Sequence, residues 1–173
     1  MQKKYRRILR ESIETAGMTL ALFCFLVTFV VQGYKVYGSC MEPNLRTGER
    51  LLGSKFIYRL ERPTRGDVIV FGYPRNPQKV FVKRIIGLPG ETVEIRGGKV
   101  YVNGRVLDER PYVKNIPHGD FPPQKIPKGC VFVLGDNRDE SNDSRFWGDL
   151  PLSNIRAKAC LRYWPLSRLA IFR

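Results

Sequence analysis

The stretch ETVEIRGGKVYVNGRVL, residues 91–107, decides the fold class of this chain of 173 residues. Its short runs of alternating apolar and polar residues are separated by Gly97-Gly98 and by Asn103-Gly104. Alternation with a period of two is typical of a strand with one buried face. Gly-Gly and Asn-Gly supply the positive φ that two-residue hairpin turns require. The stretch therefore predicts an antiparallel β-meander.

Similar runs lie on both sides of this meander. They are rich in β-branched and aromatic residues and are bounded by turn residues, as strands are. These runs are residues 65–71, 80–86 and 130–134. Residues 112–128 are rich in proline and predict an irregular connection.

We therefore expect a mainly β fold, with an antiparallel β-sheet core formed by residues 35–89 and 128–173. Residues 90–127, which hold the meander and the proline-rich segment, are expected to be inserted between the two parts of this core. The chain contains no internal repeat and no low-complexity segment, so a repeat architecture is excluded.

Residues 15–34 carry no formal charge and are mostly apolar. A helix of about twenty residues rises roughly 30 Å, the thickness of the hydrocarbon core of a bilayer. The segment therefore predicts a single transmembrane anchor. The first ten residues are rich in Lys and Arg, whereas the other flank offers only Lys35. The positive-inside rule places residues 1–14 in the cytoplasm and everything after residue 34 outside it.

Two alternatives for this segment are a cleaved signal peptide and a lipoprotein signal. A signal peptide has the same order of charge and apolar residues, but no small-x-small cleavage site follows Val31. A lipoprotein signal would use Cys40, but Tyr37 stands where that signal has an aliphatic residue, and Lys35 separates Cys40 from the apolar run. We therefore favour a retained anchor.

The chain is strongly basic, with 30 Lys and Arg against 16 Asp and Glu and a formal net charge of +14. Basic proteins often bind nucleic acid or anionic membranes. After the N-terminus, however, the cations are interspersed with acids and form no long block of like charge. We expect no nucleic-acid partner. The single His nearly excludes a histidine-based metal site or a His-centred triad, so we also expect no metal and no other cofactor.

Residues 38–43, GSCMEP, form the first of three clusters that carry more polar chemistry than a β scaffold needs. A thiol or hydroxyl in a turn that begins at Gly38 and ends at Pro43 would be held exposed. Neighbouring backbone N–H groups could then face a developing oxyanion.

Lys83 is the second cluster, because it lies in the middle of an apolar run. Strand alternation puts it on one face with Phe81 and Ile85. Burial there would favour the uncharged amine, which can accept a proton near neutral pH. The structural alternative is a lysine at a sheet edge whose ammonium reaches solvent, and the residue alone leaves it open.

The third cluster is GDNRDESNDSRFWG, residues 135–148. It could be a solvated acidic loop or a calcium loop. A calcium loop needs Gly where Ser141 stands, and the interspersed Arg residues would repel a cation. A network of Asp–Arg pairs that fixes the loop is the better structural interpretation.

In this order, the clusters resemble the bacterial type I signal peptidases, membrane-bound Ser/Lys proteases that remove signal peptides. The resemblance rests on four motifs that cover most of the region after the anchor. They are CMEPNL at 40–45, RGDVIVF at 65–71, KRIIGLPGE at 83–91 and GDNRDESNDSRFWG at 135–148. The resemblance implies the signal-peptidase fold, a β-sheet catalytic core that LexA-like proteins share.

The resemblance also assigns catalytic roles. Cys40 stands at the position of the nucleophile, and Lys83 resembles the general base that takes its proton and returns it to the leaving amine. Ser141 falls where the family has a serine that orients this lysine. The oxyanion hole would use the backbone N–H of residue 40, and Gly38 stands where some members add a side-chain hydroxyl.

Further residues are implied to support the loop and to bind the substrate. Ion pairs are expected between Arg84 and Asp136 and between Asp143 and Arg145. The substrates would be secretory preproteins, which bind as an extended strand and are cut after a small-x-small motif such as A-x-A. The shallow apolar pockets for the small residues would be formed by Val36, Met41, Leu45, Val70, Phe81 and Val82.

The location implied is the bacterial plasma membrane, with a single span, a cytoplasmic N-terminus and an extracytoplasmic catalytic domain. The partners would be preproteins and the lipid bilayer, and a monomer is expected.

The nucleophile position departs from the family, which has serine there. Ser39 does not replace it, because a shift of one residue aims the side chain in a different direction. An unperturbed thiol has a pKa of about 8.5 against about 10.4 for an amine of the lysine type. A thiolate–ammonium pair would therefore hold a nucleophile but no neutral base. We expect reduced activity relative to a serine form.

Two other functions compete with this interpretation. A LexA- or UmuD-like self-cleaving protein shares the Ser/Lys pair, but such proteins are soluble and lack an apolar span like residues 15–34. A membrane-tethered basic binding module would leave the motif at residues 135–148 unexplained. Cys130 and Cys160 could form a disulfide outside the cytoplasm, and their spacing leaves this open.

Overall fold

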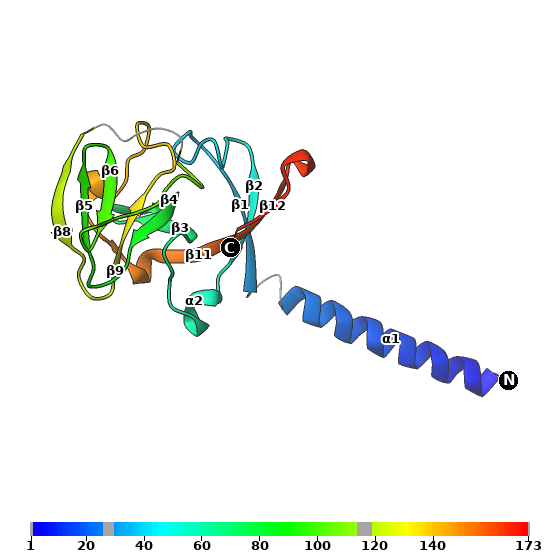
Figure 1. Cartoon of the computed structure of the whole chain (residues 1–173). Helices are drawn as coiled ribbons and strands as arrows, with labels where there is room; N and C mark the ends of the chain where they lie inside the picture. The colour runs from blue at the N-terminus through cyan, green and yellow to red at the C-terminus, as the bar shows by residue number, and fades with distance from the viewer. Residues whose placement is uncertain (1, 26–29, 114–118, 173) are drawn as a thin grey trace.

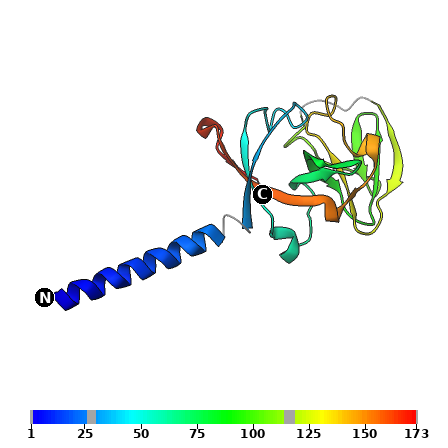
Figure 2. The same ribbon diagram turned by 180° about the vertical axis from the view of Figure 1, so that it is seen from behind.

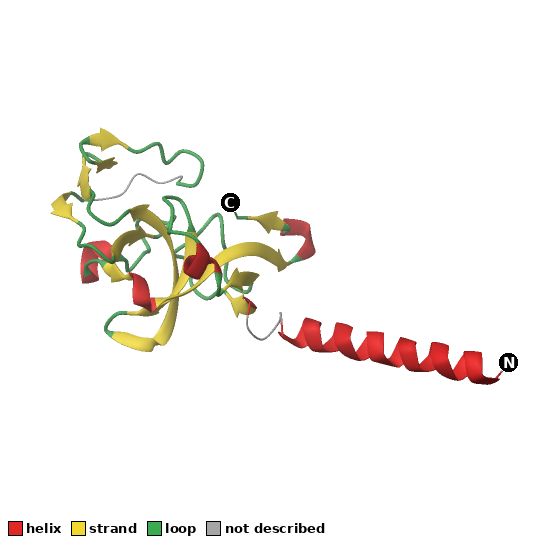
Figure 3. Cartoon of the chain, turned by 90° about the horizontal axis from the view of Figure 1, so that it is seen from below, coloured by secondary structure: helices red, strands yellow, loops and turns green. Residues whose placement is uncertain are grey.

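The computed structural model describes residues 2–25, 30–113 and 119–172. A long helix, α1 (Gln2–Phe25), projects away from a body made of two β-sheets, as the views from the two sides show (Figures 1 and 2). Seen from below, strands make up most of this body and its helices are single short turns (Figure 3). These turns are α2 (Ile57–Leu60), α3 (Ser144–Trp147), η2 (Leu152–Asn154) and η3 (Leu166–Arg168).

The larger sheet has eight strands and all its pairings are antiparallel. Its order is β1 (Val31–Lys35), β2 (Arg50–Ser54), β11 (Ile155–Trp164), β3 (Val68–Tyr73), β4 (Asn76–Gly87), β9 (Cys130–Leu134) and β10 (Leu150–Pro151), with β12 (Ala170–Ile171) paired to β11. The smaller sheet has the order β7 (Arg105–Val106), β6 (Lys99–Val102), β5 (Thr92–Arg96) and β8 (Phe121–Lys125). The predicted mainly antiparallel β fold is confirmed.

The predicted meander is the centre of the smaller sheet. β5 pairs with β6 and β6 pairs with β7, both antiparallel. The turns have the expected backbone: φ is 54° at Gly97, 72° at Gly98, 51° at Asn103 and 76° at Gly104. Positive φ at both central residues gives the turn a twist that matches the twist of the strands.

The prediction that residues 112–128 are irregular is wrong for residues 121–125, which form β8. Two prolines, Pro122 and Pro123, lie inside this strand. β8 is the edge of the smaller sheet and pairs only with β5 within the described ladders. Proline is tolerated at an edge because its missing N–H is not required by a second neighbour.

The prediction of one helix over residues 15–34 is wrong at its C-terminal end. Residues 31–35 form β1, and Val31 to Lys35 pair with Ser54 to Arg50 of β2. Valine and tyrosine favour a strand, and Gly33 weakens a helix. Residues 26–29 of the predicted anchor lie outside the described residues. In the part that the structure describes, no helix combines the length and the apolar character needed to cross a bilayer.

The two sheets share part of their apolar core. One buried cluster contains side chains of the smaller sheet together with Ile86, Phe132 and Leu134 of the larger one. Gly87 stands at the junction, where a Cβ atom would lie 2.3 Å from the Ile126 side chain and 2.6 Å from that of Val93. Glycine is therefore needed for this close approach.

The cysteines are all free thiols, so Cys130 and Cys160 are not joined. Burial, together with the nearby charge of Asp149, raises the pKa of the Cys130 thiol. The Cys130 and Cys160 side chains are both half-buried, and an unpaired cysteine in such a position behaves as a small apolar residue.

Candidate active site

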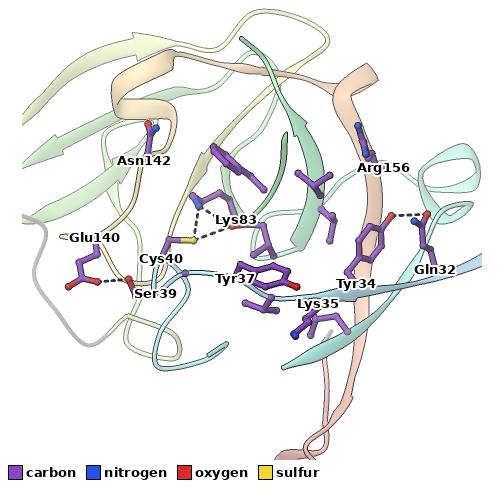
Figure 4. Close-up of a pocket in the computed structure, with 17 residues that line it drawn as sticks. Gln32, Tyr34, Lys35, Tyr37, Ser39, Cys40, Lys83, Glu140, Asn142 and Arg156 are labelled. Carbon is purple, nitrogen blue, oxygen red and sulfur yellow. Dashed lines mark hydrogen bonds between the residues drawn. The ribbon is translucent and has the colours of Figure 1, made fainter. Parts of the chain in front are cut away.

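A groove of about 530 Å³ lies beside strand β4, between that strand and the segment that follows β1 (Figure 4). Residues 34–40 line one wall, and residues 80–83 of β4 line the other. The loop after β9 contributes Glu140 and Asn142 at one end, and β11 contributes Arg156 near the other. With Leu51 of β2 and Val70 of β3, the groove gathers residues from six separate parts of the sequence.

Cys40 and Lys83 meet inside this groove. Lys83 Nζ lies 2.9 Å from Cys40 Sγ and donates a second hydrogen bond of 3.1 Å to the Val82 carbonyl oxygen. The Lys83 side chain is buried, with 3% exposed, so the alternative of a lysine reaching solvent at a sheet edge is wrong. The Cys40 thiol is half-buried and lies 3.8 Å from the same carbonyl. A thiol and an amine in direct contact have the geometry that a nucleophile and its general base require.

The turn that carries Cys40 is fixed by backbone hydrogen bonds. Glu42 N donates to the Ser39 carbonyl at 2.9 Å, and Leu45 N donates to the Met41 carbonyl at 2.8 Å. Gly38, two residues before Cys40, has a φ of 86°, which a residue with a Cβ atom rarely adopts. The sequence expectation of a turn led by this glycine is therefore met in the backbone.

The loop after β9 holds this turn from the other side. Asn137 N donates to the Cys40 carbonyl at 3.0 Å, and its amide Nδ2 donates to the Ser39 carbonyl at 3.3 Å. At Gly135 a Cβ atom would lie 2.4 Å from the Cys40 carbonyl oxygen and 2.3 Å from Ser141 Oγ. Sequence reasoning missed Gly135 and Asn137 as residues that contact the turn of Cys40, although both lie in the motif at residues 135–148.

Ser141 belongs to this loop, and its hydroxyl lies beside Gly135 rather than in a hydrogen bond with Lys83. Its side chain is 5% exposed, and its hydroxyl has no hydrogen-bond partner among the residues that the structure describes. The hydroxyl is therefore buried beside the Cys40 turn with an unused donor, and the expected bond to Lys83 is not formed in this structure.

Both expected ion pairs are present and buried. Arg84 binds Asp136 through two hydrogen bonds, of 2.8 Å from Nε and 2.7 Å from Nη2, and Asn44 Nδ2 adds a third to the same carboxylate at 2.8 Å. Arg145 Nε donates to Asp143 at 2.8 Å. Two-pronged contacts of this kind fix the planes of both groups. The Arg84–Asp136 pair holds the loop after β9 against the strand that carries Lys83, and the Arg145–Asp143 pair fixes the end of that loop where α3 begins.

A third buried pair was not foreseen from the sequence. The Arg138 side chain is fully buried and donates to Glu109 at 3.0 and 2.5 Å. Tyr112 lies close by, with its ring 4.4 Å from the Arg84 guanidinium. Burial is the main cause that raises the Tyr112 pKa, and the charge of Glu109 adds to it. Because Glu109 and Tyr112 follow the meander, this segment also supports the loop.

Four of the six predicted pocket residues line the groove: Val36, Val70, Phe81 and Val82. Met41 and Leu45 do not line it, because both are buried in the apolar cluster beneath it. The turn of the chain after Cys40 carries these two side chains inward.

Several lining residues were not expected, among them Tyr34, Glu140 and Arg156. Tyr34 is part of the predicted anchor, but in the structure it lies in β1. Burial raises the pKa of its hydroxyl, an effect that the Arg156 charge opposes. Glu140 accepts a hydrogen bond from Ser39 Oγ across 101 positions of sequence. The local sequence pattern around either residue does not predict a contact between them.

Comparison with known proteins identifies the relatives of this arrangement. The family described as "Signal peptidase, peptidase S26" matches residues 9–164. A signal peptidase I of Leptolyngbya laminosa is 41% identical over 97% of this chain and 86% of its own length. Signal peptidase IB of Staphylococcus aureus is 33% identical over 94% of this chain and 93% of its own.

The fold agrees with a solved structure. A signal peptidase I of Enterococcus faecalis superposes with a TM-score of 0.50 and 36% sequence identity, covering 57% of this chain and 97% of that one. The match over most of the sequence and the matching fold lead to one conclusion. This chain belongs to the signal peptidase family, peptidase S26.

Proposed function

We propose that this chain is an endopeptidase that removes N-terminal signal peptides from secreted preproteins, cutting after a small-x-small motif. The observation that carries the proposal is the contact of 2.9 Å between Lys83 Nζ and Cys40 Sγ inside the groove. The relatives reported above bear the name signal peptidase, which supports this choice of substrate.

In the proposed reaction, Lys83 takes the thiol proton and Cys40 Sγ attacks the carbonyl carbon of the scissile bond. The C–S bond forms, the C–N bond breaks, and the lysine returns the proton to the leaving amine. The signal peptide is then held on Cys40 as a thioester, which water hydrolyses. The backbone N–H of Cys40 is proposed to stabilise the oxyanion, and Ser141 is proposed to orient the lysine when the substrate is bound.

The substrate is proposed to bind in the groove as an extended strand beside β4. Val36 and Val70 are buried, with 4% and 2% exposed, and Phe81 lines the groove with them. The walls are therefore apolar at these residues. Small residues before the cut fit such walls, whereas a long or charged side chain would meet apolar surface without a partner.

We also propose that the N-terminal segment attaches the protein to a bacterial plasma membrane, with residues 1–14 in the cytoplasm and the groove outside. The proposal is supported by the uncharged stretch at residues 15–34 and by the cations before it. Carbonate extraction of membranes that contain the full chain tests it. Release of the protein into the supernatant would contradict the attachment.

The thiol is proposed to lower the turnover. A thiolate beside an ammonium leaves no neutral lysine to act as base. Cys40→Ser is therefore expected to raise turnover. Lys83→Ala is expected to lower it by about 10²- to 10⁴-fold, the usual contribution of a general base. Lys79→Ala is the matched control, because Lys79 is an exposed lysine of the same strand.

The decisive experiment is cleavage of a purified preprotein, with the cut site mapped by mass spectrometry. Cutting after a small-x-small motif is the expected result. Turnover that is the same in Cys40→Ser, Lys83→Ala and the unaltered chain would sink the assignment. Loss of turnover in the Lys79→Ala control would show that the effect of Lys83→Ala is not specific to the groove.

A further inference from the structure

The nucleophile of this site is sulfur, and this determines the fate of the acyl group after the first half of the reaction. An oxygen ester is hydrolysed readily, whereas a thioester reacts with amines much faster than with water. We propose that the chain transfers the peptidyl group from Cys40 to an amine acceptor, in competition with hydrolysis. This rests on the proposed function, because it needs the same acyl group on Cys40.

The groove has two ends of different charge. Lys35 and Arg156 line the end that adjoins the apolar walls, and Glu140 lies at the other end, beyond Cys40 and Lys83 (Figure 4). Among the described lining residues, Glu140 is the one acidic side chain. Since the residues before the cut occupy the apolar side, the leaving amine departs toward Glu140, and an incoming amine arrives by the same path.

Glu140 is held in place for this role. Its carboxylate accepts a hydrogen bond from Ser39 Oγ, the residue directly before the nucleophile. Asn137, three positions earlier, binds the backbone of both Ser39 and Cys40. These hydrogen bonds fix the position of the Glu140 carboxylate relative to the turn that carries Cys40 Sγ. An exposed carboxylate accepts N–H hydrogen bonds from an amine and raises the local concentration of cationic acceptors.

The transfer step balances without any further reactant. The amine nitrogen attacks the thioester carbonyl, a C–N bond forms, and the C–S bond breaks. One proton leaves the attacking nitrogen for Lys83, which lies 2.9 Å from the sulfur, and Lys83 then passes it to the sulfur. The thioester of Cys40 and a primary amine become an amide and the free thiol. The same lysine therefore serves an incoming amine and a departing one.

The acceptor that fits is an unhindered peptide N-terminus. It is a primary amine, it can lie extended in the groove as the mature chain does, and its ammonium form is attracted by Glu140. At pH 8 about half of such groups are the free, reactive base. Triglycine amide is a suitable probe, because it has this N-terminus and no side chains.

The test is the product ratio when a synthetic signal-peptide substrate is cleaved by the full chain in detergent with added triglycine amide. Mass spectrometry separates the ligated peptide from the free acid. The ratio is expected to rise in proportion to the amine. In Cys40→Ser the ligated product is expected to be lost while the acid remains, because an oxygen ester favours water.

Glu140→Gln tests the acceptor end of the groove. The ratio is expected to fall by about two- to fivefold, the effect of one exposed charge pair. Glu61→Gln, the same change at an exposed acid outside the groove, should leave the ratio as it is. Since a ratio of products is measured, a change in the rate of acylation does not affect it.

The outcomes separate this inference from the proposed function. Cleavage that gives only the free acid at every amine concentration overturns the transfer and leaves the endopeptidase intact. If Cys40→Ser gives the same ratio of ligated peptide to free acid as the unaltered chain, the transfer does not depend on the sulfur of Cys40, which overturns the inference. No cleavage in any form overturns both the transfer and the endopeptidase.

Discussion

The two sheets share an apolar boundary but differ in what they bury. The smaller sheet has an interior of Val93, Ile95, Val100 and Val102. The larger sheet and the loops around it bury the charged side chains Glu49, Asp67, Lys83, Asp136, Arg138, Asp143 and Arg162, and none of the buried charged residues described lies in residues 90–127. Burial of charge costs free energy unless each group is paired. The comparison shows that the interior of the smaller sheet is apolar, whereas the larger region also depends on buried charges that must be paired.

The largest expected effect comes from breaking a buried pair in the larger region. Asp136→Asn removes the negative charge that faces Arg84 and is expected to lower the free energy of unfolding by about 3–5 kcal/mol. Asp108→Asn is the matched change in residues 90–127, where the pair with Arg110 is exposed. Denaturant unfolding of both variants is the measurement. Equal losses would remove the contrast between the two regions.

Gly135→Ala is expected to act on the site more than on the fold. The new methyl group would meet the Cys40 carbonyl oxygen. Because Cys40 is the proposed nucleophile, its displacement by about 1 Å can lower the rate by about 10²-fold. Gly33→Ala is the control, because a Cβ atom there makes only an ordinary contact of 3.6 Å with Tyr163. Preprotein turnover per folded molecule is measured. Full turnover of Gly135→Ala would show that the turn can shift without loss.

Ile95→Val tests the smaller sheet. The lost methylene should cost about 0.5–1.5 kcal/mol of unfolding free energy, because Ile95 is 1% exposed in the apolar cluster. Turnover per folded molecule is expected to stay as it is. A variant that lost turnover at unchanged stability would mean that the smaller sheet takes part in catalysis, which would break the comparison.

The smallest effect expected is a change in acid sensitivity. Burial alone would raise the pKa of Asp67, but hydrogen bonds from Lys158, Thr64 and Tyr58 outweigh it and hold the pKa below its usual value. Between the two pKa values of Asp67, the folded state therefore binds fewer protons than the unfolded state. The stabilisation by the ionised carboxylate is fully present above the unfolded pKa and is lost as the pH falls through the folded pKa. Asp67→Asn should flatten the loss of stability below about pH 4. The measurement is the denaturant midpoint of unfolding as a function of pH. Parallel curves for Asp67→Asn and the unaltered chain would contradict this prediction.

The sequence predicted the local part of the structure well. The meander turns were predicted because Gly97-Gly98 and Asn103-Gly104 are pairs of residues that readily adopt the positive φ these turns need. The contact of Cys40 with Lys83 could be expected only through the family motifs, since 43 positions separate them. The family motifs also predicted the Arg84–Asp136 pair. The resemblance therefore predicted long-range contacts that the hydrophobic periodicity of the sequence does not indicate.

The features that could not be predicted from the sequence are those that form only through contacts with distant parts of the chain. Residues 31–35 look like the end of an apolar helix until β2 is present to pair with them. β8 is a strand because it lies at an edge, which its prolines alone do not reveal. Glu140 enters the groove because its loop folds back on Ser39. In each case the missing information is a partner that is distant in sequence.

The pairing of β4 with β9 has a consequence for how this protein can vary. Gly87, at the end of β4, faces Phe132 of β9 across the ladder, so the chain leaves the larger sheet and returns to it at nearly the same place. The entropy cost of closing a loop grows slowly with its length. Residues 88–129 could therefore vary in length without moving the groove on two conditions. The segment must keep Glu109 and Tyr112, which contact Arg138 and Arg84, and it must leave room for the packing around Gly87.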